Sequence, residues 1–376
     1  MLTHAQWADV VDFAKAADAR IVTSFATSEG ARDANRAWNP EQARALVNYT
    51  RSLGGSIYAA ELTNEPNTGK YQPADFVRDQ AIFRKFLKAD APEIKSVGPG
   101  TVGEAGFNAG VTVPREQTTE AFMSPEPKPA FDIFDYHFYG AVSQRCSRLG
   151  KDAMISADEA LSEAWLARTN KAYTFYAALH DRFDAAAPIW VTETAQSACG
   201  GDAWAATFLD SFRYVDQLGR LAKNNVAAVF HNTLAASDYA LLDDTNFRPR
   251  PNYWAALLWR RLMGETVLDA GQVMPGLHVY AQCLRGRPGG VALVAINLDR
   301  AEAGVLDVPM AGDRFTLSAD VLQSETVKLN GRPLALTPQD GLPPLPPVHT
   351  AKGRLVLAPA SITFLALPRA ANPACR

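Results

Sequence analysis

The sequence predicts an α/β fold: a (β/α)8 barrel that lacks its first two strands, followed by an antiparallel β-sandwich. Two observations predict it. From residue 1 to about residue 264, apolar strand-like runs alternate with helical segments, a pattern typical of a parallel sheet. After about residue 268, short strand-like runs follow one another between Gly, Pro and Asn turns, which indicates antiparallel pairing. We therefore expect two domains, at residues 1–267 and 268–376.

The first domain supplies six expected strands, which lie near residues 20, 56, 94, 131, 188 and 226. A helix is expected before the first strand, at residues 3–19, and another after the last, at residues 253–263. Further helices are expected between the strands, at residues 40–53, 73–90, 157–183 and 204–224. A closed barrel of this kind needs eight strands, so the six count as strands three to eight. An open barrel edge exposes unpaired backbone and apolar surface. On this reasoning we expect a chain truncated at its N-terminus.

The second domain supplies seven expected strands, at residues 278–284, 290–297, 304–308, 315–318, 326–330, 354–357 and 361–367. The Pro-rich segment at residues 341–347 lies between two of them. It has two interpretations, a polyproline ligand or a stiff surface loop. Its position between strands favours the loop.

Composition narrows the class of protein. The chain has 376 residues, 47% hydrophobic and 20% charged, with a net charge of -3 and a pI of about 6.1. A nucleic-acid partner would call for clustered Lys and Arg, so none is expected. The sequence has no run of 18 apolar residues, so no membrane span is expected. Its N-terminal residues do not form a signal peptide. The sequence gives no indication of the oligomeric state.

The four cysteines are Cys146, Cys199, Cys283 and Cys375. They form no CxxC pair, so no metal site is expected. Four buried free thiols are one interpretation. However, Cys146 and Cys199 each follow a strand end in the first domain, and Cys283 and Cys375 bracket the C-terminal half. This division favours the disulfides Cys146–Cys199 and Cys283–Cys375 and an oxidising compartment, hence a secreted, periplasmic or cell-surface protein.

Two glutamates mark a candidate active site. Asn64-Glu65-Pro66 follows the strand expected at residues 56–63, and Glu193 ends the strand that begins at residue 188. In a barrel glycosidase, carboxyl ends of strands carry the acid/base and the nucleophile. The alternative is that Asn-Glu-Pro is only a turn, because Asn and Pro both favour turns. The matching context of Glu193 argues against it, and strand counting places the pair on strands four and seven.

Several separate segments now support a family. They are residues 61–67, 136–139, 190–194, 214–219, 237–242, 247–254, 258–264 and 285–293. In these segments the sequence resembles glycoside hydrolase family 79, the heparanase and β-glucuronidase-like enzymes, and above all the plant and bacterial heparanase-like branch. The resemblance implies a carbohydrate substrate and no cofactor.

The resemblance also implies roles for individual residues. Glu65 is the expected acid/base and Glu193 the expected nucleophile. Asn64 is expected to bind the sugar 2-hydroxyl. His137 and Tyr139 are expected to orient the nucleophile and line the pocket, with packing at the barrel mouth as the alternative.

A second segment is expected to bind the substrate carboxylate. Tyr239 and the backbone around Ser237 and Asp238 match the segment that holds glucuronate in the family. The chain departs from the family here, because the charge of Asp238 would oppose an anionic sugar. His231 and Asn232 stand where a Gln is common, and they are expected to contact the sugar.

The expected function is retaining hydrolysis of β-linked glucuronic acid, or a related sugar, from glycans or glycosides. One alternative is an endo-β-glucuronidase that acts on heparan sulfate-like chains. The net charge of -3 argues against so anionic a substrate, although a local basic cleft would permit it. A second alternative is a non-catalytic carbohydrate-binding relative inactivated by truncation.

Overall fold

The computed structural model describes residues 2–69, 71–105, 113–149, 151–271 and 273–376. The chain divides into two compact units. The first unit comprises Met1–Gly106, Thr112–Phe138 and Thr174–Glu193, and the second comprises Phe107–Val111, Tyr139–Tyr173 and Thr194–Arg376. The domain boundary near residue 267 stays a prediction.

The expected parallel sheet is confirmed. Its strands are β1 (Ile21–Ser24), β2 (Ile57–Glu61), β3 (Lys95–Thr101), β4 (Ile133–Tyr139), β5 (Ile189–Ala195) and β6 (Ala228–His231), and their order in the sheet is their order in the chain. Pairing from β1 to β4 is parallel throughout. All six strands lie within a few residues of the segments expected from the sequence.

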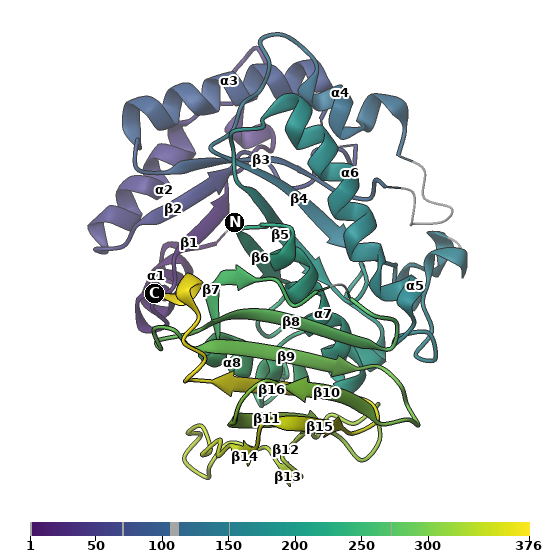
Figure 1. Cartoon of the computed structure of the whole chain (residues 1–376). Helices are drawn as coiled ribbons and strands as arrows, with labels where there is room; N and C mark the ends of the chain where they lie inside the picture. Colours follow the sequence, from purple (N-terminus) through teal and green to yellow (C-terminus); the bar gives the residue numbers. More distant parts are fainter. Residues whose placement is uncertain (1, 70, 106–112, 150, 272) are drawn as a thin grey trace. The chain divides into compact units, whose positions relative to one another are not determined.

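Helices of the first unit cover its strands through apolar faces. They are α1 (His4–Ala16), α2 (Glu41–Ser52), α3 (Pro73–Asp90) and α4 (Thr119–Met123), and Figure 1 shows α2 and α3 beside β1 to β3. Thr3 and Gln6 form a capping box that begins α1. Phe83 and Phe86 of α3 pack edge-on against Trp38. These side chains share one buried cluster with Ile57 of β2.

The helix expected at residues 157–183 is interrupted. The structure has instead a short helix α5 (Glu163–Leu166) followed by α6 (Arg168–Phe183). The Ser162 side chain accepts a hydrogen bond from the Trp165 amide and caps α5. A serine hydroxyl competes with helical backbone bonds in this way, which explains why the helix begins there and not at residue 157.

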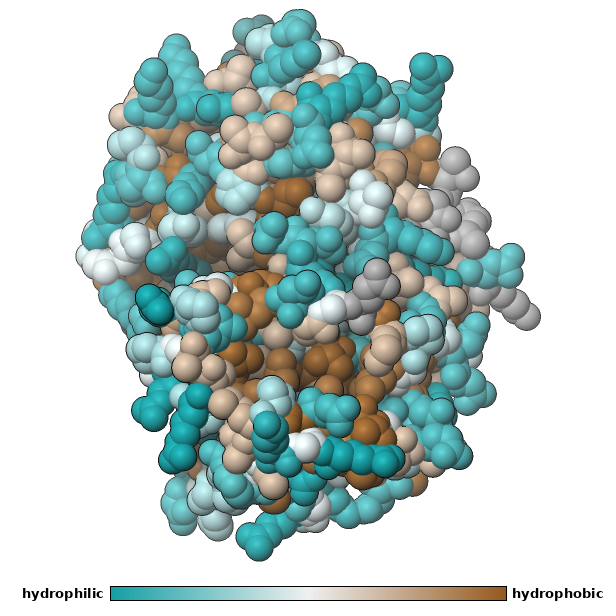
Figure 2. All heavy atoms as spheres, in the orientation of Figure 1, coloured by the Kyte–Doolittle hydropathy of each residue, from teal (hydrophilic) through white to brown (hydrophobic). Residues whose placement is uncertain are grey.

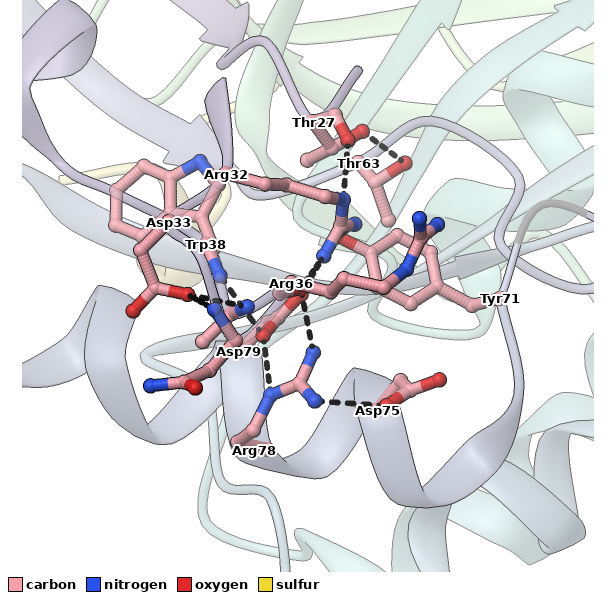
Figure 3. Close-up of polar contacts among 12 residues, drawn as sticks. Thr27, Arg32, Asp33, Arg36, Trp38, Thr63, Tyr71, Asp75, Arg78 and Asp79 are labelled. Atoms are coloured by element: carbon pink, nitrogen blue, oxygen red, sulfur yellow. Dashed lines mark hydrogen bonds and ion pairs between the residues drawn. The ribbon is translucent and has the colours of Figure 1, made fainter. Parts of the chain in front are cut away.

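A polar network fastens the loop after β1 to helix α3 (Figure 3). Asp79 of α3 is fully buried and accepts hydrogen bonds from Arg32 Nη1 at 2.8 Å and from Arg78 Nε at 2.9 Å. It also accepts the Trp38 amide at 3.1 Å. Arg32 continues to the Tyr71 hydroxyl at 2.9 Å. A single buried carboxylate therefore accepts three donors, and one of them, Arg32, extends the network to Tyr71.

Antiparallel sheets dominate the second unit, as expected. The larger sheet contains β7 (Met263–Leu268), β8 (Leu277–Leu284), β9 (Val291–Asn297), β11 (Gly312–Ser318), β12 (Lys328–Leu329), β13 (Arg332–Pro333), β14 (Val348–Thr350) and β16 (Ser361–Leu367). The smaller pairs β10 (Gly304–Val308) with β15 (Gly353–Leu357). Strands β7, β13 and β14 are additional to those expected. Strand β7 follows helix α8 directly, where the sequence suggested only a connection.

Apolar side chains line both faces of the larger sheet. Helices α7 (Phe208–Lys223) and α8 (Pro251–Leu262) pack on one face, and Figure 1 shows both behind the sheet. Phe212 of α7, Trp254 of α8 and Phe364 of β16 are buried in this core. On the other face, Leu355 of β15 packs with Leu365 of β16. Figure 2 shows apolar side chains where Figure 1 places β8 and β9.

The second unit also contains two disulfides, Cys146–Cys199 and Cys283–Cys375. The first joins the segment after β4 to the segment after β5. The second joins the end of β8 to the C-terminal 3-10 turn (Pro373–Cys375). Among the residues that the structure describes, no helix is long and apolar enough to cross a membrane.

The buried carboxylate of Asp79 gives a stability prediction. Asp79→Ala removes the buried member of an ion pair and leaves Arg32, whose side chain is 12% exposed, without its carboxylate, and breaking a buried pair typically costs about 3–5 kcal/mol. We expect the urea midpoint of the first unit, followed by tryptophan fluorescence, to fall accordingly. Asp75→Ala is the matched control, because its ion pair with Arg78 is 51% exposed at the carboxylate and such pairs contribute about 1 kcal/mol or less. Equal losses in the two variants would contradict this assignment.

Candidate active site

Glu65 lies in the turn after β2 with a left-handed backbone, at φ 48°. This conformation costs a residue with a Cβ about 1–2 kcal/mol. The surrounding hydrogen bonds hold it: the Glu65 amide donates to the Gly100 carbonyl at 3.2 Å, and the Thr68 hydroxyl donates to the Glu65 carbonyl at 2.8 Å. Strain of this kind concentrates at functional sites because it fixes a side chain in one direction.

Asn67 locks the same turn to the loop after β3. Its amide nitrogen donates to the Val102 carbonyl at 2.7 Å, and its amide oxygen accepts from the Val102 amide at 3.1 Å. The residue is buried. Both ends of the Asn67 side chain are therefore satisfied by one neighbour. Asn64, which precedes Glu65, is half-buried.

His137 brings the two expected catalytic glutamates together. It lies on β4, a strand buried along its whole length. Its Nδ1 is 3.1 Å from Glu65 Oε1 and 3.8 Å from Glu193 Oε2, and Glu193 comes from β5. One atom from each of the three side chains lies within 4.8 Å of the others. The glutamates are 21% and 29% exposed, so both carboxyls are open to a ligand while His137 is enclosed.

His137 is a cation in this setting. Burial disfavours the charged ring, but the hydrogen bond with Glu65 and the charges of Asp135, Glu193 and Glu61 raise the pKa of His137 to about 9. Protonated imidazole donates from both nitrogens, so the Nδ1–H donates to Glu65. The carboxyls of Glu65 and Glu193 lie close enough together to surround a positive charge, and the protonated ring of His137 is that charge.

Sequence reasoning missed two further carboxyls at this site. Glu61 is the last residue of β2, and Asp135 lies two positions before His137 on β4. Burial and the nearby charge of Asp135 raise the pKa of Glu61 to about 7, and burial also raises the pKa of Asp135. Carboxyls inside otherwise apolar strands were the available signal, because burying a charge is costly without a purpose.

A second group of expected site residues meets in the second unit. Asn232 Nδ2 donates to the Tyr139 hydroxyl at 2.7 Å and to the Tyr239 hydroxyl at 3.3 Å. The two tyrosine rings lie 6.4 Å apart between centroids. Asn232 thus holds both phenols in one place, which suits a polar surface that receives sugar hydroxyls or a carboxylate.

His231 contacts the backbone of Tyr239 and so supports the tyrosine pair. Burial, followed by the charge of Arg213, lowers the pKa of His231 to about 4, so the ring is neutral. Its Nε2 donates to the Tyr239 carbonyl at 2.7 Å, and its ring packs edge-on against Tyr214. The expected sugar contact of His231 stays a prediction, and the observed bonds make it a support for Tyr239.

Arg145 pairs with the Asp238 carboxylate, and Arg250 orders the loop that carries it. Arg145 Nη2 donates to Asp238 Oδ2 at 2.7 Å, and Arg145 Nη1 donates to the Gly201 carbonyl at 2.5 Å. Arg250 donates to the carbonyls of Ser237 and Asp238 at 2.8 and 3.0 Å. The neighbouring disulfide at Cys146 fixes the segment that carries Arg145. Asp238 is therefore paired, which reduces its repulsion of an anionic ligand.

Comparisons with known proteins agree on one family. The profile described as "Glycosyl hydrolase family 79, N-terminal domain" matches residues 1–219. Heparanase-like protein 1 of Arabidopsis thaliana is 28% identical over 384 residues, which cover 90% of this chain and 68% of that protein. Baicalin-beta-D-glucuronidase of Scutellaria baicalensis is 31% identical over 254 residues, which cover 64% of this chain and 46% of that protein.

A solved structure agrees on the fold. The 4-O-alpha-L-rhamnosyl-beta-D-glucuronidase from Fusarium oxysporum 12S superposes with a TM-score of 0.65 at 14% identity. The superposition covers 96% of this chain and 79% of that one. At this identity the likeness concerns the fold alone.

The pKa of His137 predicts a pH-dependent stability. Because the folded-state pKa of about 9 lies above the unfolded value of 6.5, the stabilisation is fully present below pH 6.5 and is lost as the pH rises through about 9. The difference corresponds to roughly 3 kcal/mol. We expect the urea unfolding free energy of the wild type to fall more steeply from about pH 7.5 to 9.5 than that of His137→Gln. Parallel pH profiles for the two proteins would show that His137 is neutral.

Proposed function

Since the chain belongs to glycosyl hydrolase family 79 and is therefore a glycosidase, we propose that it cleaves β-linked glucuronic acid, or a closely related sugar, with retention of configuration. In this proposal the six parallel strands are strands three to eight of a (β/α)8 barrel, and the antiparallel sheets form a β-sandwich. Glu65 is the acid/base and Glu193 the nucleophile.

The observation that carries the proposal is the short separation of Glu65 and Glu193. A carboxylate oxygen of one lies within 4.8 Å of an oxygen of the other, and His137 contacts both. Retaining glycosidases hold their carboxyls about 5–5.5 Å apart, whereas inverting enzymes need about 6.5–9.5 Å to admit a water molecule. The spacing therefore supports double displacement.

The reaction proceeds in two steps. In the first, Glu193 attacks the anomeric carbon while Glu65 gives its proton to the glycosidic oxygen, so the aglycone leaves as an alcohol. In the second, Glu65 takes a proton from water as that water attacks the anomeric carbon, which releases the sugar and frees Glu193. Asn64 is proposed to bind the 2-hydroxyl beside the acid/base.

Glucuronate is the proposed sugar because of the group around Tyr239. Two phenols held by Asn232 offer hydroxyl donors to a carboxylate. Arg145 compensates Asp238, the residue that would otherwise oppose an anion. The name of the Scutellaria protein, a β-glucuronidase, supports the same sugar. The two disulfides support an oxidising compartment.

The roles of the two glutamates are tested with 4-nitrophenyl β-D-glucuronide. We expect Glu193→Gln to abolish turnover, because no covalent intermediate forms. Glu65→Ala should lower kcat by about 10²- to 10⁴-fold, since the loss is one of general acid–base catalysis. Azide should rescue Glu65→Ala and yield the β-glucuronosyl azide, because a small anion attacks the intermediate without a base.

Glu120→Gln is the control, because its carboxylate is exposed and, among the described residues, its ion pair is with Arg182. Wild-type activity in Glu193→Gln would refute the proposed nucleophile. If the wild type binds glucuronides by calorimetry but never hydrolyses them, the chain is the carbohydrate-binding relative.

The sugar and the mode of action are tested separately. We expect Tyr239→Phe to raise KM for the β-glucuronide by roughly tenfold, the effect of one lost hydrogen bond to a charged group, and to change KM for the matching β-glucoside little. Equal effects on both sugars would remove Tyr239 from carboxylate recognition. Incubation with heparan sulfate, followed by size analysis of the products, distinguishes the endo-acting alternative, which shortens the chains internally.

A further inference from the structure

A second pair of carboxyls lies behind His137, and the two catalytic steps do not use it. Asp135 is fully buried, and one atom each of Glu61, Asp135 and His137 lies within 4.8 Å of the others. Glu61 comes from β2 and Asp135 from β4, and β3 lies between these strands in the sheet. The pair is thus formed across a strand whose own residue there, Gly100, has no side chain.

Gly100 explains how two carboxyls fit in one place. A Cβ on Gly100 would lie 3.0 Å from Glu61 Oε2 and 3.9 Å from Asp135 Oδ2, so both oxygens converge over this residue. The Gly100 backbone is also left-handed, at φ 65°, and its amide donates to Asp135 Oδ1 at 2.8 Å. Glycine at this position makes room for the pair and gives it a donor.

One oxygen of the Glu61–Asp135 pair has no hydrogen-bond partner among the described residues. Asp135 accepts from the Gly100 amide and from the Thr192 hydroxyl. Glu61 Oε1 accepts from the Ser24 hydroxyl at 2.7 Å. Glu61 as a residue keeps some exposed surface, but its Oε2 atom is buried and has no partner among the described residues. A buried ionised oxygen without a donor is costly, whereas a protonated oxygen becomes a donor itself.

Charge counting leads to the same protonation state. The groups that face this position are Glu61 of β2, Glu65 of the following turn, Asp135 and His137 of β4, and Glu193 of β5, while β1 and β3 contribute Ser24 and Gly100. Adjacent carboxylates in a buried site do not both ionise readily, as in any dyad of like charges. Burial and mutual repulsion both favour one proton on the pair, in line with the pKa of about 7 for Glu61.

We propose that Glu61 and Asp135 share a single proton and together act as positioning residues, which keep His137 positively charged and its Nδ1–H directed at Glu65 Oε1. This inference rests on the proposed function, because it assigns the purpose of the pair to the acid/base. With Oε1 occupied as an acceptor, the proton that Glu65 exchanges with substrate is carried by Oε2. The imidazolium then stays in place while Glu65 alternates between acid and carboxylate.

The number of protons on the pair has a distinctive signature. If one proton is shared, Glu61→Gln leaves Asp135 to carry the full negative charge, and Asp135→Asn leaves it to Glu61. Each single variant then keeps the charge next to His137 unchanged. Only the double variant removes it. If both carboxyls are ionised, each single variant removes one charge and the two effects add.

The experiment compares the imidazole NMR signals of His137 at about pH 6, with labelled histidine and on the whole chain without substrate, because the pair loses its proton near a pH of about 7. We expect each single variant to keep these signals close to those of the wild type, and the double variant to shift them. Glu104→Gln is the matched control, a buried carboxyl that is hydrogen-bonded to Thr119 instead. Additive shifts, or no shift in the double variant, would overturn the shared proton.

Kinetics tests the positioning role. The alkaline limb of kcat for the β-glucuronide should move with the pKa of His137 in each variant, while KM stays within about twofold. If kcat falls by the same factor at every pH and the alkaline limb of the profile does not move, the pair has only a structural role. If the chain hydrolyses no glucuronide yet the NMR pattern holds, the proposed function fails and the charge assembly stands. If the chain hydrolyses the glucuronide but the NMR shifts are additive, the proposed function stands and the shared proton is refuted.

A measurement on the wild type tests the shared proton even if the variants do not fold. With labelled Asp and Glu carboxyl carbons, we expect one carboxyl of the Glu61–Asp135 pair to remain protonated at about pH 6, where ordinary carboxyls are ionised. A spectrum in which every carboxyl is ionised at that pH would overturn the proposal without any substitution.

Discussion

Four carboxyl groups surround one imidazole ring, and this crowding of negative charge is the constraint that the first unit satisfies. Side chains alternate along a strand, so Asp135 and His137, two residues apart on β4, point to the same side. Glu61 and Glu193 reach the same place from β2 and β5. Burial alone would drive a proton off the ring and onto the carboxyls. The cation survives because its neighbours are close enough to outweigh that cost.

The backbone of the unit serves this arrangement. Glu65 adopts a left-handed conformation, and Gly100 gives up a side chain so that two carboxyls can meet. Neither the strained backbone of Glu65 nor the missing side chain of Gly100 improves the core. Both hold ionisable groups at fixed distances, and a strained backbone persists where the surrounding structure determines its conformation. The apolar packing of α2 and α3 on the sheet provides that support.

Much of this was predictable from the sequence, for identifiable reasons. All six parallel strands are marked by apolar runs between amphipathic segments, and Glu65 and Glu193 are marked by their positions at strand ends. Glu61 and Asp135 escaped because their meeting depends on the register of three strands, which no local pattern encodes. The pairing of Asp238 with Arg145 escaped likewise, since 93 residues separate the partners. What looked in the sequence like a misplaced charge has a distant counterion.

Asn67 belongs to the same structural motif as Asn64-Glu65-Pro66, because it anchors the turn that carries Glu65. Its side chain copies the donor and acceptor of a backbone amide and pairs with Val102 as a neighbouring strand would. Aspartate, the nearest substitute in shape, lacks the donor and would break half of this pairing. A search of genomes for similar sites should therefore require four residues, Asn-Glu-Pro-Asn, and not three. The fourth residue separates a glutamate whose backbone is anchored from one that merely follows a turn.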